Sequence, residues 1–400
     1  MTDGAGRISD TDRLILSLLR EDCSALVDGT GRPVDWDAVL ARAETHGVEP
    51  LLYHQWRSAG RLEAFPAGSV QALQCIYYRV VARNTLYLQA LEAILSSLAT
   101  WGITPILLKG AGLVATVYDS PALRPMGDLD LLVLPGEFRT ALQCLGKLGY
   151  QPTHQEQFPG AYEAVTHHVG LRREASFGSL VELHHHWLSL PGSLSRYVSM
   201  EEVRQRAIAV QVGQARAWVL APADQVLHLS GHIAIHSPVT QRFIWYYDLD
   251  RVIRRYEQSL DWALILKRAV DYRMVLPLQR VLPAVASMLG TPVPAEVLEE
   301  LGRILVDPRE RQRYAPSALG PHSRVVDGLQ KLSGLEGVGA RLKFAWQMLF
   351  PSWSYMSASY PDEGLARQLG RYPARWGSAL RELTSAWRGR RSNWRSQESL

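Results

Sequence analysis

Two aspartates at the start of an apolar segment are the residues of this sequence best suited to bind a metal ion. Asp128 and Asp130 begin the segment 128–134, whose run of leucine and valine predicts a strand over Leu129–Leu134. Because side chains alternate between the two faces of a strand, both carboxylates should project to one side while Leu129 and Leu131 face the core. Carboxylates spaced in this way can share hard cations such as Mg²⁺, which prefer oxygen ligands.

A third acid follows in the segment 181–187, which reads Val-Glu-Leu-His-His-His-Trp. The same alternation places Glu182, His184 and His186 on one face of a predicted strand. If this strand lies beside 129–134, Glu182 completes a triad of carboxylates with Asp128 and Asp130. Such a triad suits two-metal phosphoryl transfer, in which the aspartates hold both ions and Glu182 holds the ion that activates the attacking group. The sequence therefore predicts two Mg²⁺ ions at one site.

A glycine-containing turn precedes the acids and is a candidate for phosphate binding; its residues are Lys109, Gly110, Ala111 and Gly112. Glycines let the backbone approach a phosphate at the start of a helix, where N–H groups and the helix dipole favour an anion. Lys109 either neutralises phosphate charge or is a strand-end lysine whose stem packs on apolar surface. Arg124 either binds a triphosphate or pairs with Asp128 or Asp130.

The histidines allow other interpretations. His184 and His186 share a face, but no cysteine stands near them and the neighbouring ligands are hard oxygens. A contact of His184 with the nucleotide or the acceptor is therefore favoured over zinc. His228, His232 and His236 lie four residues apart, so they share one face of a predicted helix. This spacing can bind a metal, but it is more typical of a packed or solvated stripe.

Apolar periodicity indicates which elements position these residues. Helices are predicted throughout 10–100, and a short strand over 103–108 leads through the glycine turn into a helix that ends near Tyr118. Beyond the strand 129–134 we expect a helix at 137–148 and two further strands, at 164–171 and 179–184, joined by a hairpin turn at 174–178. From Pro222 onward the pattern is helical again, with helices at 225–235, 242–256, 262–270 and 295–305.

This order of elements predicts an α+β fold, a mixed α/β core of about eighty residues that is too small for a doubly wound sheet. The chain of 400 residues is longer than one ordinary domain. We expect a helical section at 1–100, the α/β core at 101–190, a helical domain at 191–360 that closes the cleft and selects the acceptor, and an arginine-rich tail at 361–400.

Composition limits the classes of partner. The 43 basic and 39 acidic residues give a net charge of +4, too small for a nucleic-acid footprint over the whole surface. Residues 367–395 hold eight arginines and one acid. This run is either a solvated tail or a contact with phosphate-bearing material such as RNA. Three scattered cysteines, a polar N-terminus and the absence of a long apolar run predict a soluble cytoplasmic protein without a membrane span.

The order of strand, glycine turn, helix, Arg-x3-Asp-x-Asp strand, helix and acid-bearing hairpin resembles the nucleotidyltransferases of the DNA polymerase beta superfamily. It is more closely similar to a poorly characterised bacterial nucleotidyltransferase family with the pattern Leu-Lys-Gly, Tyr, Arg-x3-Asp-x-Asp-Leu-Leu-Val and Glu/Asp-Leu-His. The matching residues here are Leu108, Lys109, Gly110, Tyr118, Arg124, Asp128, Asp130, Leu131, Leu132, Val133, Glu182, Leu183 and His184. The resemblance extends over roughly Asp10–Tyr360.

The resemblance implies a small polymerase-beta-like core and Mg²⁺-dependent transfer of a nucleoside monophosphate from a nucleoside triphosphate such as ATP. The acceptor it allows is a small molecule, a peptide or protein hydroxyl, or an RNA end. Ala111 stands where the family often has a hydroxyl residue, and the spacing from Gly110 to Asp128 is longer than in much of the superfamily. The alternative is a non-catalytic nucleotide-binding scaffold or sensor that keeps the fold, and a third interpretation, an RNA-modifying enzyme, rests on the arginine tail.

Overall fold

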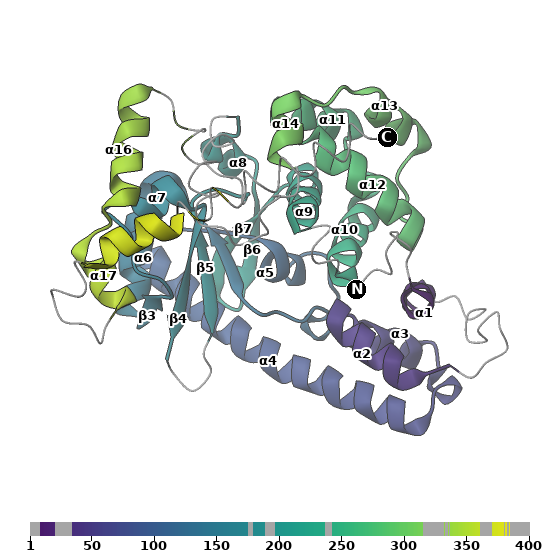
Figure 1. Cartoon of the computed structure of the whole chain (residues 1–400). Helices are drawn as coiled ribbons and strands as arrows, with labels where there is room; N and C mark the ends of the chain where they lie inside the picture. The colour runs from purple at the N-terminus through teal and green to yellow at the C-terminus, as the bar shows by residue number, and fades with distance from the viewer. Residues whose placement is uncertain are drawn as a thin grey trace.

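The structure is a computed structural model that describes residues 9–20, 34–174, 179–188, 197–236, 242–314, 332, 335, 337–360, 370–379, 381 and 384. Four helices form its N-terminal part: α1 (Asp10–Leu19), α2 (Trp36–His46), α3 (Glu49–Ser58) and α4 (Ala67–Thr100). The described residues before β1 are therefore mainly helical. Helix α4, with 34 residues, runs from the N-terminal helices to the sheet and so connects the two parts of the molecule (Figure 1).

The sheet has seven strands in the order β3-β4-β5-β2-β1-β7-β6. Their bounds are β1 (Ile106–Leu107), β2 (Leu129–Leu132), β3 (Tyr150–Pro152), β4 (His168–Arg173), β5 (Leu180–His184), β6 (Ile208–Val212) and β7 (Ala215–Val219). Strand β2 pairs parallel with β5 and antiparallel with β1, and β4 pairs antiparallel with β5. The sheet is mixed, as the sequence predicts.

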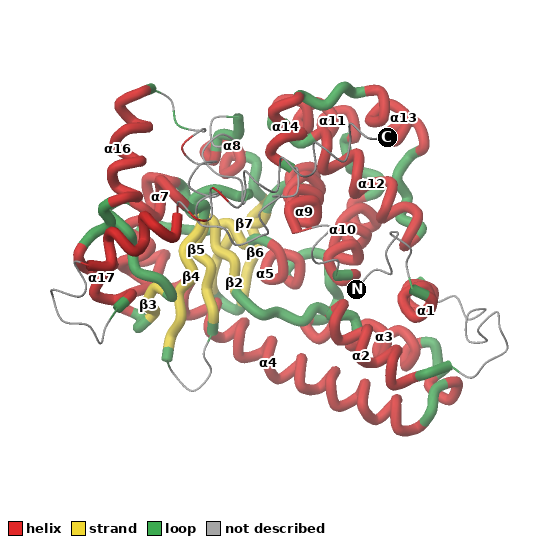
Figure 2. The backbone as a smooth tube through the Cα atoms, in the orientation of Figure 1, coloured by secondary structure: helices red, strands yellow, loops and turns green. Residues whose placement is uncertain are grey.

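One face of the sheet is apolar and carries a hydrophobic core. Leu129 and Leu131 of β2 and Val181 and Leu183 of β5 pack there with apolar side chains of α4 and of α6 (Phe138–Lys147). Figure 2 shows these helices against the strands. The intervening residues of the same strands project to the other face, which α5 (Lys109–Val114) and the C-terminal helices approach. The alternation of β2 and β5 thus separates a packing face from a polar face.

The C-terminal part of the chain is helical. Its helices are α9 (Pro222–His236), α10 (Phe243–Tyr256), α11 (Trp262–Asp271), α12 (Val275–Leu289), α13 (Ala295–Arg303), α14 (Pro308–Arg313), α16 (Val338–Leu349) and α17 (Trp353–Ser359). The apolar side chains of α9–α13 share one core with those of α1–α3, whereas Phe344 of α16 packs separately with Phe158 and Ala161. None of the described helices is both long enough and apolar enough to cross a membrane.

Several elements differ from the prediction. The predicted strand 164–171 begins at His168, because residues 161–165 form the short helix α7 (Ala161–Val165). The hairpin β6–β7 was not predicted, and β7 pairs parallel with β1, so the sheet continues beyond the expected core boundary at residue 190. Alternation in 208–219 is weak because β6 is largely exposed at the sheet edge. Residues 175–178 of the hairpin turn lie outside the described residues.

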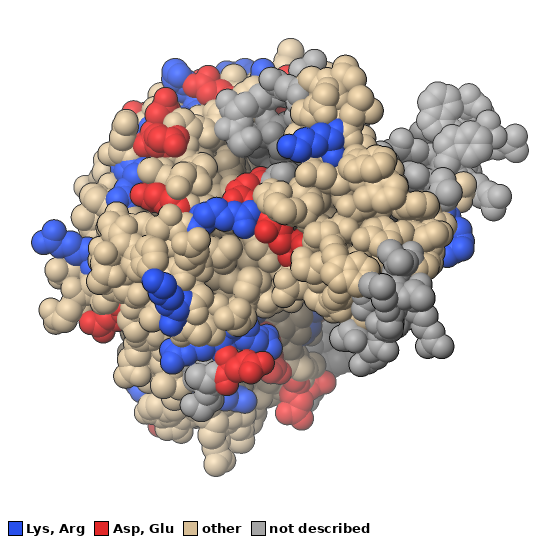
Figure 3. Space-filling model, turned by 90° about the vertical axis from the view of Figure 1, so that its left-hand side faces the viewer, with Lys and Arg blue, Asp and Glu red and all other residues tan. Residues whose placement is uncertain are grey.

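The arginine-rich tail can be followed only in part, since most of 361–400 lies outside the described residues. Residues 370–379 are helical, and the Arg371 and Arg375 guanidinium groups lie 5.0 Å and 5.3 Å from the ring centroids of Tyr360 and Tyr355. On the side of the molecule that carries α16 and α17, basic and acidic side chains are interspersed among uncharged ones (Figure 3). The described residues of this face therefore form no large patch of one sign.

Candidate active site

Asp130 and Glu182 lie directly beside each other on the polar face of the sheet. They are register partners on the parallel strands β2 and β5. Asp130 is 1% exposed, whereas Glu182 is partly accessible. On the other side of Glu182, its register partner on β4 is Gly170, which has no side chain to cover the carboxylate. The strand order thus brings together two acids that are 52 residues apart in sequence.

The ammonium group of Lys109 stands between these two carboxylates. Its Nζ atom lies 2.6 Å from Asp130 Oδ1 and 3.5 Å from Glu182 Oε2. Lys109 has a φ of +43°, a left-handed conformation that is uncommon for a residue other than glycine. Backbone strain of this kind is concentrated at functional sites. This turn places the ammonium group of Lys109 where a metal cation would contact both acids.

His184 adds a nitrogen to the same group. Its Nε2 atom lies 3.0 Å from Asp130 Oδ1 and 3.5 Å from Glu182 Oε2. Burial disfavours the charged imidazole, but the hydrogen bonds to Asp130 and Glu182 outweigh burial and raise the pKa of His184. Asp130, Glu182 and His184 each offer a ligand atom within 4.8 Å of the others, a separation that one metal ion could close.

Asp128 precedes β2 by one residue and adds a further negative charge. Burial raises the pKa of Asp128 to about 6, and repulsion by Asp130 and Glu182 contributes to this rise. For Asp130, burial acts in the same direction, but Lys109 and His184 outweigh it and lower the pKa. The pKa of Glu182 is also lowered, because His184 and Lys109 outweigh burial. The cluster therefore holds more carboxylates than permanent cations, and its oxygen-rich donor set fits Mg²⁺.

The glycine turn has a packing role that the structure shows directly. Residues 110–112 lie in the first turns of α5 and are buried. A Cβ atom on Gly112 would stand 2.6 Å from the carbonyl oxygen of Leu107, so only glycine lets α5 approach β1 this closely. Ala111 is 1% exposed and belongs to the core between the sheet and α4. Contacts of Gly110, Ala111 and Gly112 with phosphate remain a prediction.

Arg124 pairs with a residue of the helical part, not with Asp128 or Asp130. Its Nε and Nη2 atoms donate to the Asp248 carboxylate on α10 at 2.8–3.0 Å. The Tyr118 hydroxyl donates to the same carboxylate at 2.7 Å. This buried group ties the loop that precedes β2 to the C-terminal helices. To contact a triphosphate, Arg124 would have to donate from its guanidinium to a phosphate as well as to Asp248.

Helix α9 forms a wall opposite Lys109. His228, which is 3% exposed, lines a small cavity together with Lys109 and Gln225, and most of the other lining residues are apolar. Burial, with added repulsion from Lys109, lowers the pKa of His228 to about 3. His232 and His236 stack around Trp245, at 4.9 Å and 5.4 Å between ring centroids. His228 is thus buried beside Lys109, whereas His232 is half-buried and His236 is exposed.

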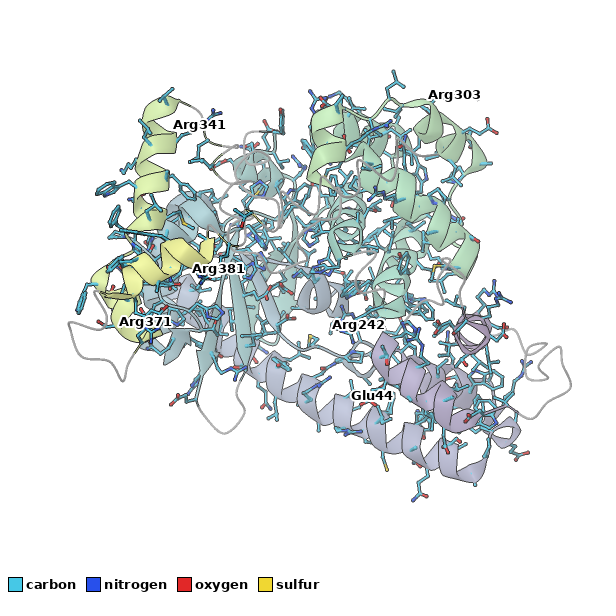
Figure 4. All side chains as sticks on the ribbon, in the orientation of Figure 1. Glu44, Arg242, Arg303, Arg341, Arg371 and Arg381 are labelled. Carbon is cyan, nitrogen blue, oxygen red and sulfur yellow. The ribbon has the colours of Figure 1, made fainter. Side chains whose placement is uncertain are left out.

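The sequence analysis missed three residues near the acids. His168 Nε2 lies 3.7 Å from Glu182 Oε1, and His167 is next to it. Hairpin register could have identified His168, because β4 and β5 are joined by a short turn that places His168 opposite His184. Arg242, at the start of α10, lies close to Gly47 and is labelled in Figure 4. No sequence pattern marked Arg242.

Arg242 is a cation without a close acid in the described part of the chain. No carboxylate there lies within ion-pair distance of its guanidinium. Burial lowers the pKa of Arg242, and the charge of Arg124 lowers it further, while Glu49, Asp248 and Asp128 act to raise it. Its positive charge therefore interacts with Asp128, and no ion pair among the described residues neutralises it. Arg242 is therefore a half-buried guanidinium with no ion-pair partner among the described residues.

Comparisons with known proteins identify the family of this chain. The sequence matches the family described as uncharacterised nucleotidyltransferase over residues 32–290, more than half of the chain, and the chain therefore belongs to this family. The predicted family membership is confirmed. A comparison with curated proteins gave no match. Among solved structures, the chain is similar to an antigenic nucleotidyltransferase-like protein from Paracoccidioides brasiliensis, with 12% identity, a TM-score of 0.32 and coverage of 53% of this chain and 96% of that one.

Proposed function

We propose that this member of the uncharacterised nucleotidyltransferase family transfers a nucleoside monophosphate from a nucleoside triphosphate to an acceptor in a Mg²⁺-dependent reaction. The observation that carries the proposal is the placement of Glu182 beside Asp130, with Asp128 one strand repeat away and their combined charge only partly balanced. Buried carboxylates repel one another unless a cation joins them. The family membership supports nucleotidyl transfer, and the cluster supports the metal.

Asp128, Asp130 and Glu182 would hold the metal, with His184 as an additional ligand. When bound, two Mg²⁺ ions supply positive charge to the triphosphate oxygens and lower the pKa of the attacking group. His184 orients the Asp130 carboxylate through its hydrogen bond. Glu182 is the more accessible of the two neighbouring acids and faces Gly170, so it is the acid best placed to meet the acceptor.

Lys109 and Arg242 are the proposed triphosphate contacts. Lys109 balances Asp130 and Glu182 at short range, and its ammonium has three donors, so it can bind a phosphate oxygen while it stays close to the acids. Arg242 offers a planar guanidinium that suits phosphate oxygens. Both cations lie near the acids but come from different parts of the fold. A triphosphate bound to both would connect the core with the start of α10.

The acceptor would enter beside α9. The small cavity behind Lys109 is lined by Gln225 and His228, and Gln225 Oε1 is buried there without a hydrogen-bond partner among the described residues. Buried polar atoms of this kind are normally satisfied in the working state. The acceptor classes remain a small molecule, a peptide or protein hydroxyl, or an RNA end.

The proposal is tested by calorimetry of ATP and other triphosphates with and without Mg²⁺. We expect binding to weaken sharply in chelator and in Asp130→Asn, while Asp271→Asn, at a partly exposed aspartate, retains it. Arg242→Gln should weaken binding about tenfold through the loss of charged hydrogen bonds, and Arg303→Gln, whose side chain is 77% exposed, should not. Equal affinity with and without metal would refute a metal-dependent donor site.

Transfer itself is measured by incubating a lysate with the protein, Mg²⁺ and each α-labelled triphosphate, followed by mass spectrometry of labelled acceptors. A transferase adds a nucleoside monophosphate to one class of acceptor, and Asp130→Asn abolishes the addition. Metal-dependent triphosphate binding without any labelled acceptor would favour the scaffold or sensor instead.

A further inference from the structure

We propose that His167, His168 and His184 form a second metal site, for a transition-metal ion such as Zn²⁺ or Co²⁺, beside the Mg²⁺ site. The sequence analysis disfavoured zinc because it considered only His184 and His186. The fold brings two other histidines, from β4 and the residue before it, to His184 on β5. The proposal concerns metal binding and does not depend on nucleotidyl transfer.

The three imidazoles are close enough to bind one ion. Each offers one nitrogen, and these nitrogens all lie within 4.8 Å of one another. The ring centroids are 4.2 Å apart for His167 and His168, 4.9 Å for His168 and His184, and 5.5 Å for His167 and His184. Nitrogen ligands of a tetrahedral zinc ion are separated by roughly 3.3 Å, since each bond is about 2.0 Å. His167 Nε2 and His168 Nδ1 lie 2.6 Å apart in a hydrogen bond, so an ion bound by both would replace this hydrogen bond and separate the two nitrogens slightly.

The backbone holds the cluster in place. His168 and His184 are register partners on the antiparallel strands β4 and β5. His167 precedes β4, and its carbonyl oxygen accepts a hydrogen bond of 3.0 Å from the His185 amide. Both chain segments that carry the histidines are thus fixed by the sheet. A site built on paired strands keeps its ligands at constant separation, as a metal site requires.

Ligand chemistry separates this site from the carboxylates. Imidazole nitrogens favour borderline transition metals, while carboxylate oxygens favour Mg²⁺. His184 belongs to both groups: its Nε2 atom contacts Asp130, and its Nδ1 atom is buried without a hydrogen-bond partner among the described residues. Two neighbouring positions therefore select two kinds of ion.

The test is a Co²⁺ titration of the metal-stripped full-length protein, followed by visible absorption, with calorimetry of Zn²⁺ and Mg²⁺. We expect one Co²⁺ or Zn²⁺ per chain, retained in excess Mg²⁺. His168→Gln and His167→Gln should each weaken Co²⁺ binding by more than about a hundredfold, because the loss of an outer-shell partner already costs about ten- to a hundredfold. His154→Gln is the matched control, because His154 is exposed and lies outside the cluster. Circular dichroism checks that each variant is folded.

Two results would overturn the proposal. One is Co²⁺ binding that is unchanged in folded His167→Gln and His168→Gln, and the other is Co²⁺ binding that is lost only in Glu182→Gln, which would place the ion among the carboxylates. Neither result bears on nucleotidyl transfer, which is tested separately with Mg²⁺ and Asp130→Asn. A protein that binds Co²⁺ through the histidines but transfers no nucleotide would support the metal site and refute the proposed function.

Discussion

Two clusters of buried charge, one among the N-terminal helices and one at the end of β2, differ in how their charges are balanced. In the first, Asp12 accepts hydrogen bonds from Arg42 at 2.7 Å and 2.9 Å and lies 3.0 Å from His46 Nε2. Burial acts to raise the pKa of Asp12, but the hydrogen bonds of Arg42 and His46 outweigh it and lower the pKa to about 2. One carboxylate with two partners is satisfied by the fold itself.

The second cluster contains three carboxylates, those of Asp128, Asp130 and Glu182, with Lys109 as the permanent cation among them. Here burial and mutual repulsion raise the pKa of Asp128 to about 6. The pKa values of Asp12 and Asp128, one from each cluster, thus shift in opposite directions. The comparison teaches that burial alone does not mark a functional acid. An excess of carboxylates that the fold leaves unbalanced marks a position for an external cation.

The largest effect expected from this difference is on turnover. Glu182→Gln keeps the shape of the side chain but removes its charge, so nucleotidyl transfer should fall by about a hundred- to ten-thousand-fold. Triphosphate binding should be largely retained, because Asp128 and Asp130 still hold an ion. Single-turnover transfer and calorimetry measure the two quantities separately. Glu299→Gln, whose side chain is 68% exposed, is the control. Near-normal transfer by Glu182→Gln would make His184 the next candidate.

A smaller effect is expected on the free energy of unfolding in the absence of metal. Replacing one aspartate should lower this free energy in the first cluster and raise it in the second. Asp12→Asn should lower the free energy of unfolding by about 1–3 kcal/mol, because Arg42 and His46 lose a charged acceptor. Asp128→Asn should raise it by about 1–2 kcal/mol at pH 8, because it removes repulsion from a carboxylate whose pKa is raised to about 6. Urea unfolding in chelator measures both. A loss of stability in Asp128→Asn would show that this cluster is balanced after all.

Added Mg²⁺ should reverse the effect of Asp128→Asn on stability, so that this variant becomes less stable than the native protein. An ion that binds the folded protein only raises its unfolding free energy, and Asp128→Asn removes a proposed ligand. The melting temperature of the native protein should therefore rise with Mg²⁺, while that of Asp128→Asn should rise less. Asp12→Asn should respond to Mg²⁺ as the native protein does, since its cluster lies among the N-terminal helices.

The two clusters also differ in how far the sequence predicts them. Alternation in 128–131 and 180–184 identified Asp130 and Glu182 and the face they share, because period-two patterns depend only on neighbouring residues. The position of Lys109 between them depends on a left-handed backbone that no pattern predicts. Partners that come from distant segments, such as Asp248 for Arg124 or Arg42 for Asp12, are set by tertiary packing. Local patterns thus predicted the acids that the fold places side by side, but not the groups that pair with them.

Helices and strands also differ in how well the sequence pattern predicts them. The helices were predicted well where apolar residues recur at helical spacing, as in α4 and α10. Strands β6 and β7 were missed because an exposed edge strand such as β6 carries little alternation. Helix α12 was missed, and it contains Pro283 within a helix whose stability comes from burial in the shared core. Burial overrides local propensity at such places.

The smallest effect expected is the pH dependence of the Asp12 cluster, and its sign follows from the lowered pKa. The folded-state pKa of about 2 lies below the ordinary value of 3.8, so the folded protein binds fewer protons in this range than the unfolded chain. The contribution of Asp12 is then fully present above pH 4 and is lost as the pH falls through 2.

The stability difference between the native protein and Asp12→Asn should shrink by about 1–2 kcal/mol from pH 5 to pH 2. Denaturant unfolding at each pH measures this difference, and Asp10→Asn, on the same helix but 97% exposed, should show none. For Asp128 the raised pKa reverses the sign, so its destabilising effect should appear as the pH rises from 4 through 6. A difference for Asp12 that stays constant down to pH 2 would mean that its carboxylate is not held by Arg42 and His46, and the contrast between the two clusters would then fail.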